Sequence, residues 1–372
     1  HSPYIQARNR ALAASARLWG HLAACEAFGQ VVGGRADLKL EDLLFTLAAL
    51  AANRDAGVAA NTVVAVFRLL KMTGARMLVA QHPKMTVPLF SGMARGLSCP
   101  DGYVAECAAA AVAIFVDDPA GRTFVFDSLP RKDLENLVGG LATLMQHPDT
   151  AAAGIACDAT CNFMSGPAGE AFLQKFLQGG LRADPSAVQE APTFWGYLFG
   201  GGQTSAPPPL EVPYELVQGA YNVLDSLLLG LATVVRRPAD KLAATNAAEV
   251  ICAVCAVEVA WLRLMGQPMD LLSALLVGIV SLARSKERAA TRNAAVILHC
   301  FTLDKDGTQI LHEQDRNQSK TLLLALHEMQ TSGDATTADL ATGALSNLAQ
   351  HESWRARMQM LDMLNTFTMG TV

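Results

Sequence analysis

One helix-like pattern recurs along this chain at a nearly constant interval, and it constrains the fold more than any other feature. Its clearest copy is residues 338–350, in which small residues such as Ala341 and Ala344 alternate at helical spacing with Leu345 and Leu348. Small side chains let neighbouring helices approach closely, while leucines fill the layer between them. Looser copies occur upstream and can be aligned through the glycine-containing turns that follow several of them.

The alignment places one position of this helix at intervals of 47 or 48 residues. The equivalent residues are Phe67, Ile114, Asn162, Cys252, His299 and Asn347. Between Asn162 and Cys252 the interval is 90 residues, about two periods, which predicts that one copy of the helix is missing there. A unit of this length cannot bury its apolar face alone, so neighbouring units are expected to stack into one continuous core.

A second amphipathic helix precedes each copy. In residues 134–145, Leu134, Leu137, Val138 and Leu141 follow the i, i+3, i+4, i+7 spacing of a helix that is buried on one face. The other predicted second helices are residues 40–52, 87–97, 216–235, 271–282 and 322–329. A short apolar segment follows several copies, at 76–80, 122–126 and 170–177. The repeating unit is therefore predicted to be one short helix followed by two longer ones.

Residues 343–349, Gly-Ala-Leu-Ser-Asn-Leu-Ala, resemble the third helix of an armadillo repeat. The period lies between those of armadillo and HEAT repeats. The resemblance implies an all-α fold, an armadillo-like right-handed α-solenoid of about six repeats. Its expected parts are an N-terminal helical cap in residues 1–30, repeats in 31–183 and 214–372, and an insertion in 184–213.

The resemblance also implies a binding surface, because armadillo arrays bind extended peptides along the concave face formed by their third helices. Asn162 and Asn347 occupy the position from which an amide can hydrogen-bond a bound main chain, and His299 occupies the same position. The alternative is that these side chains only satisfy neighbouring loops or fill the core. The Trp found four residues earlier in nuclear-import adaptors is absent from all six copies, which argues against a receptor for nuclear-localisation signals.

The central insertion is the least helical part of the sequence. It contains three consecutive glycines at 200–202 and three consecutive prolines at 207–209, a composition that excludes a helix. Within the insertion, aromatic residues precede the glycines at Phe194, Trp195, Tyr197 and Phe199. They can cover core left open by the missing helix, or they can project as an anchor for a partner, because Trp and Tyr often dominate interface energetics.

Composition and charge narrow the class of partner. The net charge of −5 and the pI near 5.9 argue against a nucleic-acid protein, which usually carries a basic stripe. We interpret the local group of Arg284, Lys286, Arg288 and Arg292 as a solvated helix end. No apolar run is long enough to predict a transmembrane segment. The start lacks Met and is basic and poor in acidic residues, which fits either a transit peptide or a basic first helix at a processed or engineered end.

Neither the cysteines nor any sequence motif indicates catalysis or metal binding. The eight cysteines lie mostly in apolar helical patterns, which indicates buried thiols in a reducing compartment and predicts neither disulfides nor a metal site. No nucleophile elbow, phosphate-binding loop, zinc-protease motif or dinucleotide fingerprint is present, so we predict no cofactor and no enzyme activity.

Together these features predict a non-catalytic intracellular scaffold that binds other proteins through the concave face and the insertion. Cytoplasmic and mitochondrial locations both stay open. Two alternatives remain, namely a structural accessory subunit of a large, for example mitochondrial, assembly and an adaptor that presents client proteins to a chaperone. The last depends on analogy of fold alone.

Overall fold

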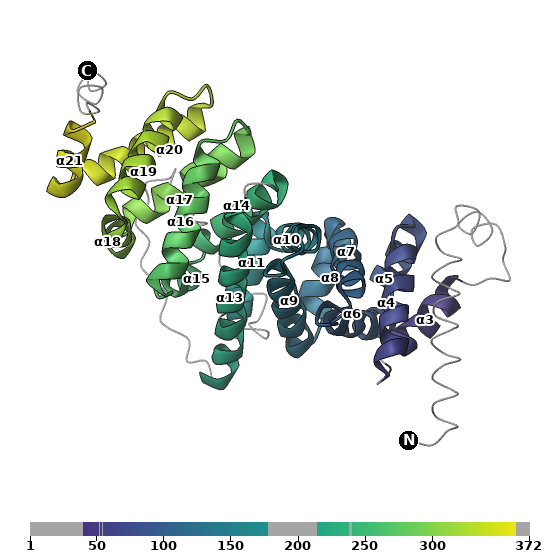
Figure 1. Ribbon diagram of the computed structural model, residues 1–372. Helices are drawn as coiled ribbons and strands as arrows, with labels where there is room; N and C mark the ends of the chain where they lie inside the picture. The colour runs from purple at the N-terminus through teal and green to yellow at the C-terminus, as the bar shows by residue number, and fades with distance from the viewer. Residues whose placement is uncertain (1–39, 52, 54, 178–213, 238–239, 362–372) are drawn as a thin grey trace, which may run out of the picture. The chain divides into compact units, whose positions relative to one another are not determined.

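The computed structural model describes residues 40–51, 53, 55–177, 214–237 and 240–361, and every regular element within them is an α-helix (Figure 1). The described chain divides into two compact units. Unit 1 lies within residues 1–163 and 222–230, and unit 2 lies within residues 164–221 and 231–372. The predicted cap at 1–30 and the insertion at 184–213 lie outside the described residues.

Unit 1 contains a helix pair followed by two triplets of one short helix and two longer ones. Its helices are α3 (Leu40–Ala51), α4 (Ala56–Leu70), α5 (Thr73–Gln81), α6 (Pro83–Leu97), α7 (Gly102–Asp117), α8 (Pro119–Ser128), α9 (Arg131–Met145) and most of α10 (Thr150–Met164). Second helices pack side by side in the order α3, α6, α9, and the third helices α4 and α7 form a parallel layer. Each repeat therefore contacts its neighbours through the same two layers.

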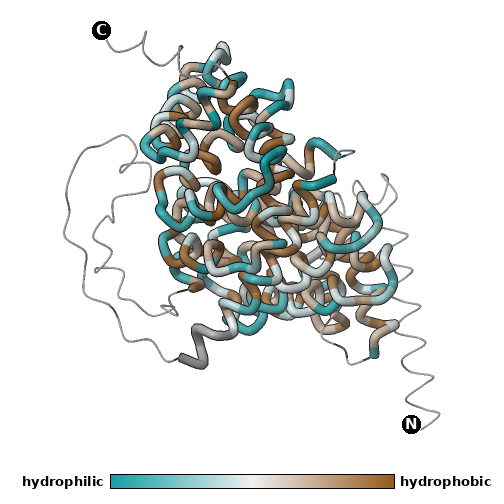
Figure 2. Tube along the Cα trace, turned by 60° about the vertical axis from the view of Figure 1, so that its left-hand side comes forward, coloured by the Kyte–Doolittle hydropathy of each residue, from teal (hydrophilic) through white to brown (hydrophobic). Residues whose placement is uncertain are grey.

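Unit 2 continues the same order of helices. Its helices are α11 (Gly166–Leu177), parts of α13 (Tyr214–Val235), α14 (Lys241–Ala256), α15 (Glu258–Met265), α16 (Met269–Ala283), α17 (Arg288–Leu303), α18 (Lys305–Glu313), α19 (Arg316–Gln330), α20 (Ala335–Ala349) and α21 (Glu352–Gln359). The third helices α14, α17 and α20 pack in sequence, and the second helix α16 packs on α19. Figure 2 shows hydrophobic stretches along the helices and hydrophilic segments at many turns. The fold is thus an all-α, armadillo-like helical repeat, as the sequence predicts.

A glycine marks the place where successive second helices cross. A Cβ atom added at Gly92 would lie 2.5 Å from the Cβ of Ala51, and one at Gly140 would lie 2.8 Å from the Cβ of Leu97. At Gly278 it would lie 2.2 Å from Cγ1 of Val235. Distances this short exclude any larger side chain unless a helix moves, so glycine is required for the close approach.

The fourth glycine of this series corrects the prediction of a missing helix. A Cβ atom at Gly230 in α13 would lie 2.8 Å from the carbonyl oxygen of Ala142 in α9, so α13 follows α9 directly in the layer of second helices. The helices α11, α13 and α14 then form one complete repeat. The interval of 90 residues arises because residues 178–213 lengthen this repeat between its first and second helices, and the prediction that a copy had been lost was wrong.

An acidic residue precedes every third helix in the described chain. These residues are Asp55, Asp101, Asp149, Asp240, Glu287 and Asp334, and they recur at nearly the same interval as the helices. In all but Glu287 the side-chain carboxylate accepts a hydrogen bond from a backbone N–H of the first turn. Such N-caps satisfy groups that the helix leaves unpaired, so they fix where each third helix begins.

Candidate functional site

The six equivalent positions predicted from the sequence all fall near the C-terminal end of a third helix. All six side chains are half-buried. They are Phe67 in α4, Ile114 in α7, Asn162 in α10, Cys252 in α14, His299 in α17 and Asn347 in α20. The predicted register of the repeats is therefore confirmed.

In unit 2 these side chains contact the neighbouring third helix. The Nδ2 atom of Asn347 donates to Oγ1 of Thr302 over 3.4 Å. The Sγ atom of Cys252 lies 3.5 Å from the carbonyl oxygen of Asn293, to which it donates. The ring of His299 lies so close to Gly343 that a Cβ there would be 2.7 Å from its Cε1 atom.

Burial affects both the hydrogen bonding and the protonation of the His299 imidazole. Its Nδ1 atom is buried and has no hydrogen-bond partner within the described part of the chain. Burial lowers the pKa of the imidazole, because the charged form loses its hydration. Among the other predicted site residues, Asn162 lies half-buried in unit 1, while Phe194, Trp195 and Tyr197 fall outside the described residues.

A groove of ≈ 880 Å³ lies over the third helices of unit 2. It is lined by the start of α11 and by the exposed faces of α14 and α17. The lining residues are Gly166, Glu170, Glu249, Cys252, Ala253, Arg288, Ala289, Arg292, Asn293 and Val296. The groove is thus floored by small and apolar residues and has charged residues on two sides.

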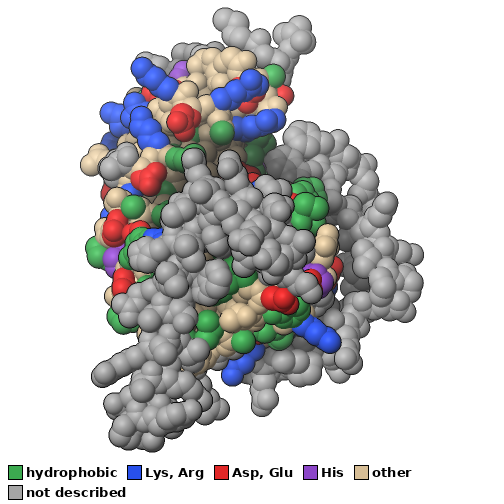
Figure 3. Space-filling view, turned by 90° about the vertical axis from the view of Figure 1, so that its right-hand side faces the viewer, with side chains coloured by type: hydrophobic (Ala, Val, Ile, Leu, Met, Phe, Trp, Pro, Cys, Tyr) green, Lys and Arg blue, Asp and Glu red, His purple; other side chains and the backbone are tan. Residues whose placement is uncertain are grey.

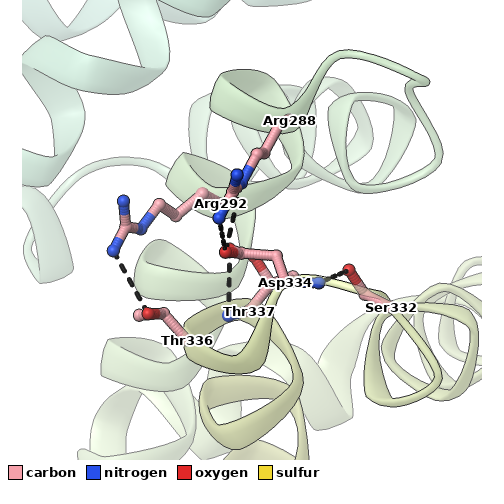
Figure 4. Close-up of polar contacts among 6 residues, drawn as sticks. All are labelled: Arg288, Arg292, Ser332, Asp334, Thr336 and Thr337. Atoms are coloured by element: carbon pink, nitrogen blue, oxygen red, sulfur yellow. Dashed lines mark hydrogen bonds and ion pairs between the residues drawn. The ribbon is translucent and has the colours of Figure 1, made fainter.

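The charges of this groove are separated by helix. Glu249 projects from α14 and makes no hydrogen bond or ion pair with any described residue. Arg292 projects from α17 and is exposed, and its Nη2 atom donates to Oγ1 of Thr336 over 3.2 Å (Figure 4). The side-chain amide of Asn293 between them has no hydrogen-bond partner among the described residues. One carboxylate, one guanidinium and one amide are therefore available to a ligand.

Glu170 adds a second carboxylate beside Glu249. Burial raises the pKa of the Cys252 thiol well above its ordinary value, and Cys300, Glu249 and Glu170 raise it further through their negative charge. Both glutamates line the same groove as Cys252. This side of the groove favours a positive charge.

Arg288 also lines the groove, but its charge is already used. Its Nε atom donates to Oδ1 of Asp334 over 3.1 Å, and its Nη2 atom donates to the same oxygen (Figure 4). Hydrogen bonds from Thr337 and Arg288 and the positive charge of Arg288 lower the pKa of Asp334 to about 2. This contact fastens the start of α17 to the start of α20, so among the described lining residues Arg292 is the cation without an ion pair.

The basic group that the sequence suggests near residues 284–292 is divided by these contacts. Arg284 forms a two-pronged ion pair with Glu328, with nitrogen–oxygen distances of 3.1 and 3.2 Å. Arg284 is the C-cap of α16, while Arg288 is the first residue of α17. In the space-filling view of Figure 3, acidic and basic side chains are interspersed over the visible described surface. The interpretation as a helix end with solvated side chains fits Lys286, whereas Arg284 and Arg288 connect neighbouring repeats.

A second hollow of ≈ 650 Å³ lies between the second helices α16 and α19. Leu276, Val277, Val280 and Leu322 contribute much of its apolar lining. The crossing position that glycine occupies in the earlier second helices is Ala325 in α19. The two ionic groups that line the hollow, Arg284 and Glu328, form an ion pair with each other.

Most cysteines of the described residues are buried, as the sequence predicts. The buried ones are Cys107, Cys157, Cys161, Cys255 and Cys300, and no disulfide joins any cysteine in the described part of the chain. No group of three or more His, Cys, Asp or Glu side chains there is arranged to hold a metal ion. No single described helix has the length and apolar character to cross a membrane, and α15 and α16 meet the test only as a pair that is bent by 111°.

No sequence motif marks Glu249 or Asn293 as a site residue. The alignment nevertheless contains one, because Glu249 lies three positions before Cys252, and Arg292 lies seven before His299. Positions three and seven residues before the reference share its helix face. A search for polar residues at those offsets would have found the groove.

Comparison with known proteins gives structural likeness only. No family model matches the sequence, and no curated protein matches it either. An engineered protein of known structure is 15% identical, with a TM-score of 0.48, and the alignment covers 83% of this chain and 99% of that one. A designed armadillo repeat protein in complex with the peptide (KR)4 is 12% identical, with a TM-score of 0.47, and the alignment covers 82% and 98%.

A structure described for a phosphorylation switch that controls the interaction between cadherin and beta-catenin is 12% identical, with a TM-score of 0.44. That alignment covers 95% of this chain and 61% of the other. Because every one of these TM-scores is below 0.5, the assignment of the fold depends on the helix triplets, the crossing glycines and the register described above.

Proposed function

We propose that this armadillo-like chain is a non-catalytic scaffold that binds an extended segment of a partner protein in the groove over α14 and α17. Three polar groups that line one groove carry the proposal. Glu249 and Arg292 form no ion pair with any described residue, and the side-chain amide of Asn293 lies between them. A partly buried polar group without a charged protein partner has already lost part of its hydration. It therefore bonds a matched ligand at little further cost, and such groups mark a binding surface.

The shape of the groove supports an extended peptide over a globular partner. Small residues such as Ala253 and Ala289 form part of the floor, which leaves room for a main chain to lie close to the helices. The amide of Asn293 can both donate to and accept from a peptide main chain. A peptide in extended conformation exposes all its main-chain groups, so one amide per repeat is enough to align it.

The test is selection of peptides from a random display library by the full-length chain. We expect soluble peptides from the selection to bind in fluorescence anisotropy, and we expect Ala289→Trp to weaken them at least about tenfold, because the exposed indole would fill the groove. Ala356→Trp, at an exposed position of α21 outside the groove, is the matched control and is expected to leave affinity unchanged. Failure to select any peptide, or equal loss in both variants, would contradict the proposal.

A further inference from the structure

The groove over α14 and α17 carries opposite charges at its two sides, and this arrangement specifies the charge pattern of what binds there. Glu249 and Glu170 lie on the side of α11 and α14, whereas Arg292 lies on α17. We propose that the bound segment is zwitterionic, with a basic residue beside Glu249 and an acidic residue beside Arg292. This inference rests on the proposed function and adds the identity of two side chains of the partner.

The two charges belong to different helices and are not partners of each other. Arg292 donates a hydrogen bond to Thr336 of α20 and forms no ion pair with any described residue. Glu249 has no ion pair with any described residue. Opposite charges that stay apart across a groove attract a ligand with the complementary pattern more strongly than they attract each other through water.

The repeat register gives the spacing that the ligand needs. Glu249 lies three residues before the reference position of its helix and Arg292 lies seven before, so they are offset by four residues, or about 6 Å along the helix axes. Packed helices lie about 8–10 Å apart, which makes the two attachment points roughly 10–12 Å apart. An extended chain rises about 3.3 Å per residue, so the basic and acidic residues are expected three to four positions apart.

The same charges exclude other classes of ligand. A nucleic acid or another polyanion would meet Glu249 and Glu170, and a purely basic segment would meet Arg292. Arg288 cannot compensate for the acidic side, because Asp334 already neutralises it. A peptide with one charge of each sign places an opposite charge against each side of the groove.

The experiment compares peptides selected from one random display library by the wild-type chain and by the double variant Glu249→Lys/Arg292→Glu. The double variant keeps the net charge but reverses the charge of both sides of the groove. A control variant, Glu352→Lys/Arg355→Glu, makes the same exchange on exposed residues of α21, away from the groove. Because all four positions are on the surface or half-buried in helices, neither exchange is expected to unfold the chain.

We expect wild-type peptides to contain a basic and an acidic residue three or four positions apart in one preferred order. The double variant is expected to select the opposite order and to bind wild-type peptides about tenfold more weakly, since two exposed ion pairs are each replaced by repulsion. The control variant is expected to select as the wild type does.

Two results would overturn the inference. Peptides that bind the wild type and are displaced by Ala289→Trp, yet lack the charge pair, would leave the proposed function intact and refute the charge pattern. The same holds if the double variant keeps the wild-type order. If no peptide is selected by any form of the chain, the proposed function fails and this inference fails with it.

Discussion

The third helices of each unit bury apolar residues in the core of their own unit, but they differ at the positions three and seven residues before the reference position. In α7 of unit 1, the positions three and seven residues before Ile114 are Ala111 and Cys107, and both are buried. In unit 2 the equivalent positions include Glu249 in α14 and Arg292 in α17, which line a groove. The contrast teaches that the repeat fixes packing while leaving a few positions per helix free to vary, and that in α14 and α17 two of these positions carry charge.

The largest expected effects test whether the two cores are equivalent. Phe115 of α7 packs edge-on against Phe90, and Phe301 of α17 packs edge-on against Trp261, with ring centroids 4.9 and 5.2 Å apart. Both phenylalanines are at most 1% exposed. We expect Phe115→Ala and Phe301→Ala each to lower the free energy of unfolding by about 3–5 kcal/mol, through lost burial and a cavity.

Urea denaturation followed by circular dichroism measures both changes. If the units unfold separately, each substitution is expected to shift only the transition of its own unit, because repeats contact only their neighbours. A loss confined to one of the two variants would show that the cores are unequal and would break the comparison.

The crossing glycines predict the next largest effect. Gly278→Ala places a methyl group 2.2 Å from Cγ1 of Val235 and 2.9 Å from its backbone, so the overpacking outweighs the gain in helix propensity. We expect a net loss of about 1–2 kcal/mol in thermal or urea unfolding. Gly139→Ala in α9 is the control, since its nearest neighbour would be 4.0 Å away, and it is expected to stabilise the chain by up to about 1 kcal/mol.

The sequence predicts the helix register correctly and the missing helix wrongly for one reason, namely that it shows local spacing and not contacts between distant residues. Helix triplets and the register through Phe67, Ile114 and Asn347 follow from apolar periodicity, which is local and repeats. The false missing helix at residues 162–252 came from counting intervals, because an interval does not say where in a repeat extra residues lie. Only the contact between Gly230 and Ala142, which are far apart in sequence, decides that question.

The site was harder to predict than the fold for a related reason. The resemblance to armadillo third helices predicts Asn347 as a binding residue, but its amide donates to Thr302 of the neighbouring repeat. Whether a polar side chain is paired depends on the neighbouring helix, which sequence spacing does not show. The structure, and not the sequence spacing, shows that Glu249 and Arg292 form no ion pair with a described residue, which makes them candidate binding residues. Their role in binding stays a prediction.

The N-cap carboxylates of the two units are expected to differ in how their stabilisation of the fold depends on pH. Asp101 caps α7 of unit 1 through one backbone hydrogen bond, whereas Asp334 caps α20 and also accepts hydrogen bonds from Thr337 Oγ1 and from Arg288. These contacts lower the pKa of Asp334 to about 2, so its carboxylate stabilises the fold above the ordinary value near 3.8. That stabilisation is lost as the pH falls from about 4 through about 2.

We therefore expect Asp334→Asn to destabilise the chain more than Asp101→Asn at neutral pH. The difference between wild type and Asp334→Asn is expected to stay constant above about pH 4 and to shrink toward pH 2. Urea midpoints measured across that range check both statements. Equal effects of the two substitutions at every pH would show that Arg288 and Thr337 add nothing to the cap.

The smallest expected effect is on the pH dependence of stability in unit 2. His299 occupies in α17 the position of Ile114 in α7, and burial lowers the pKa of its imidazole below the ordinary value of 6.5. The unfolded chain then binds a proton more readily than the folded chain, so the contribution of His299 to stability falls as the pH drops below 6.5. His299→Ile gives unit 2 the side chain of unit 1 and is expected to reduce the loss in Tm between about pH 7.5 and about pH 5.5. Histidines elsewhere are unchanged and cancel in the comparison with wild type. An unaltered pH dependence in His299→Ile would mean that the imidazole titrates alike in the folded and unfolded chains, and that its contact with Gly343 does not exclude the charged form.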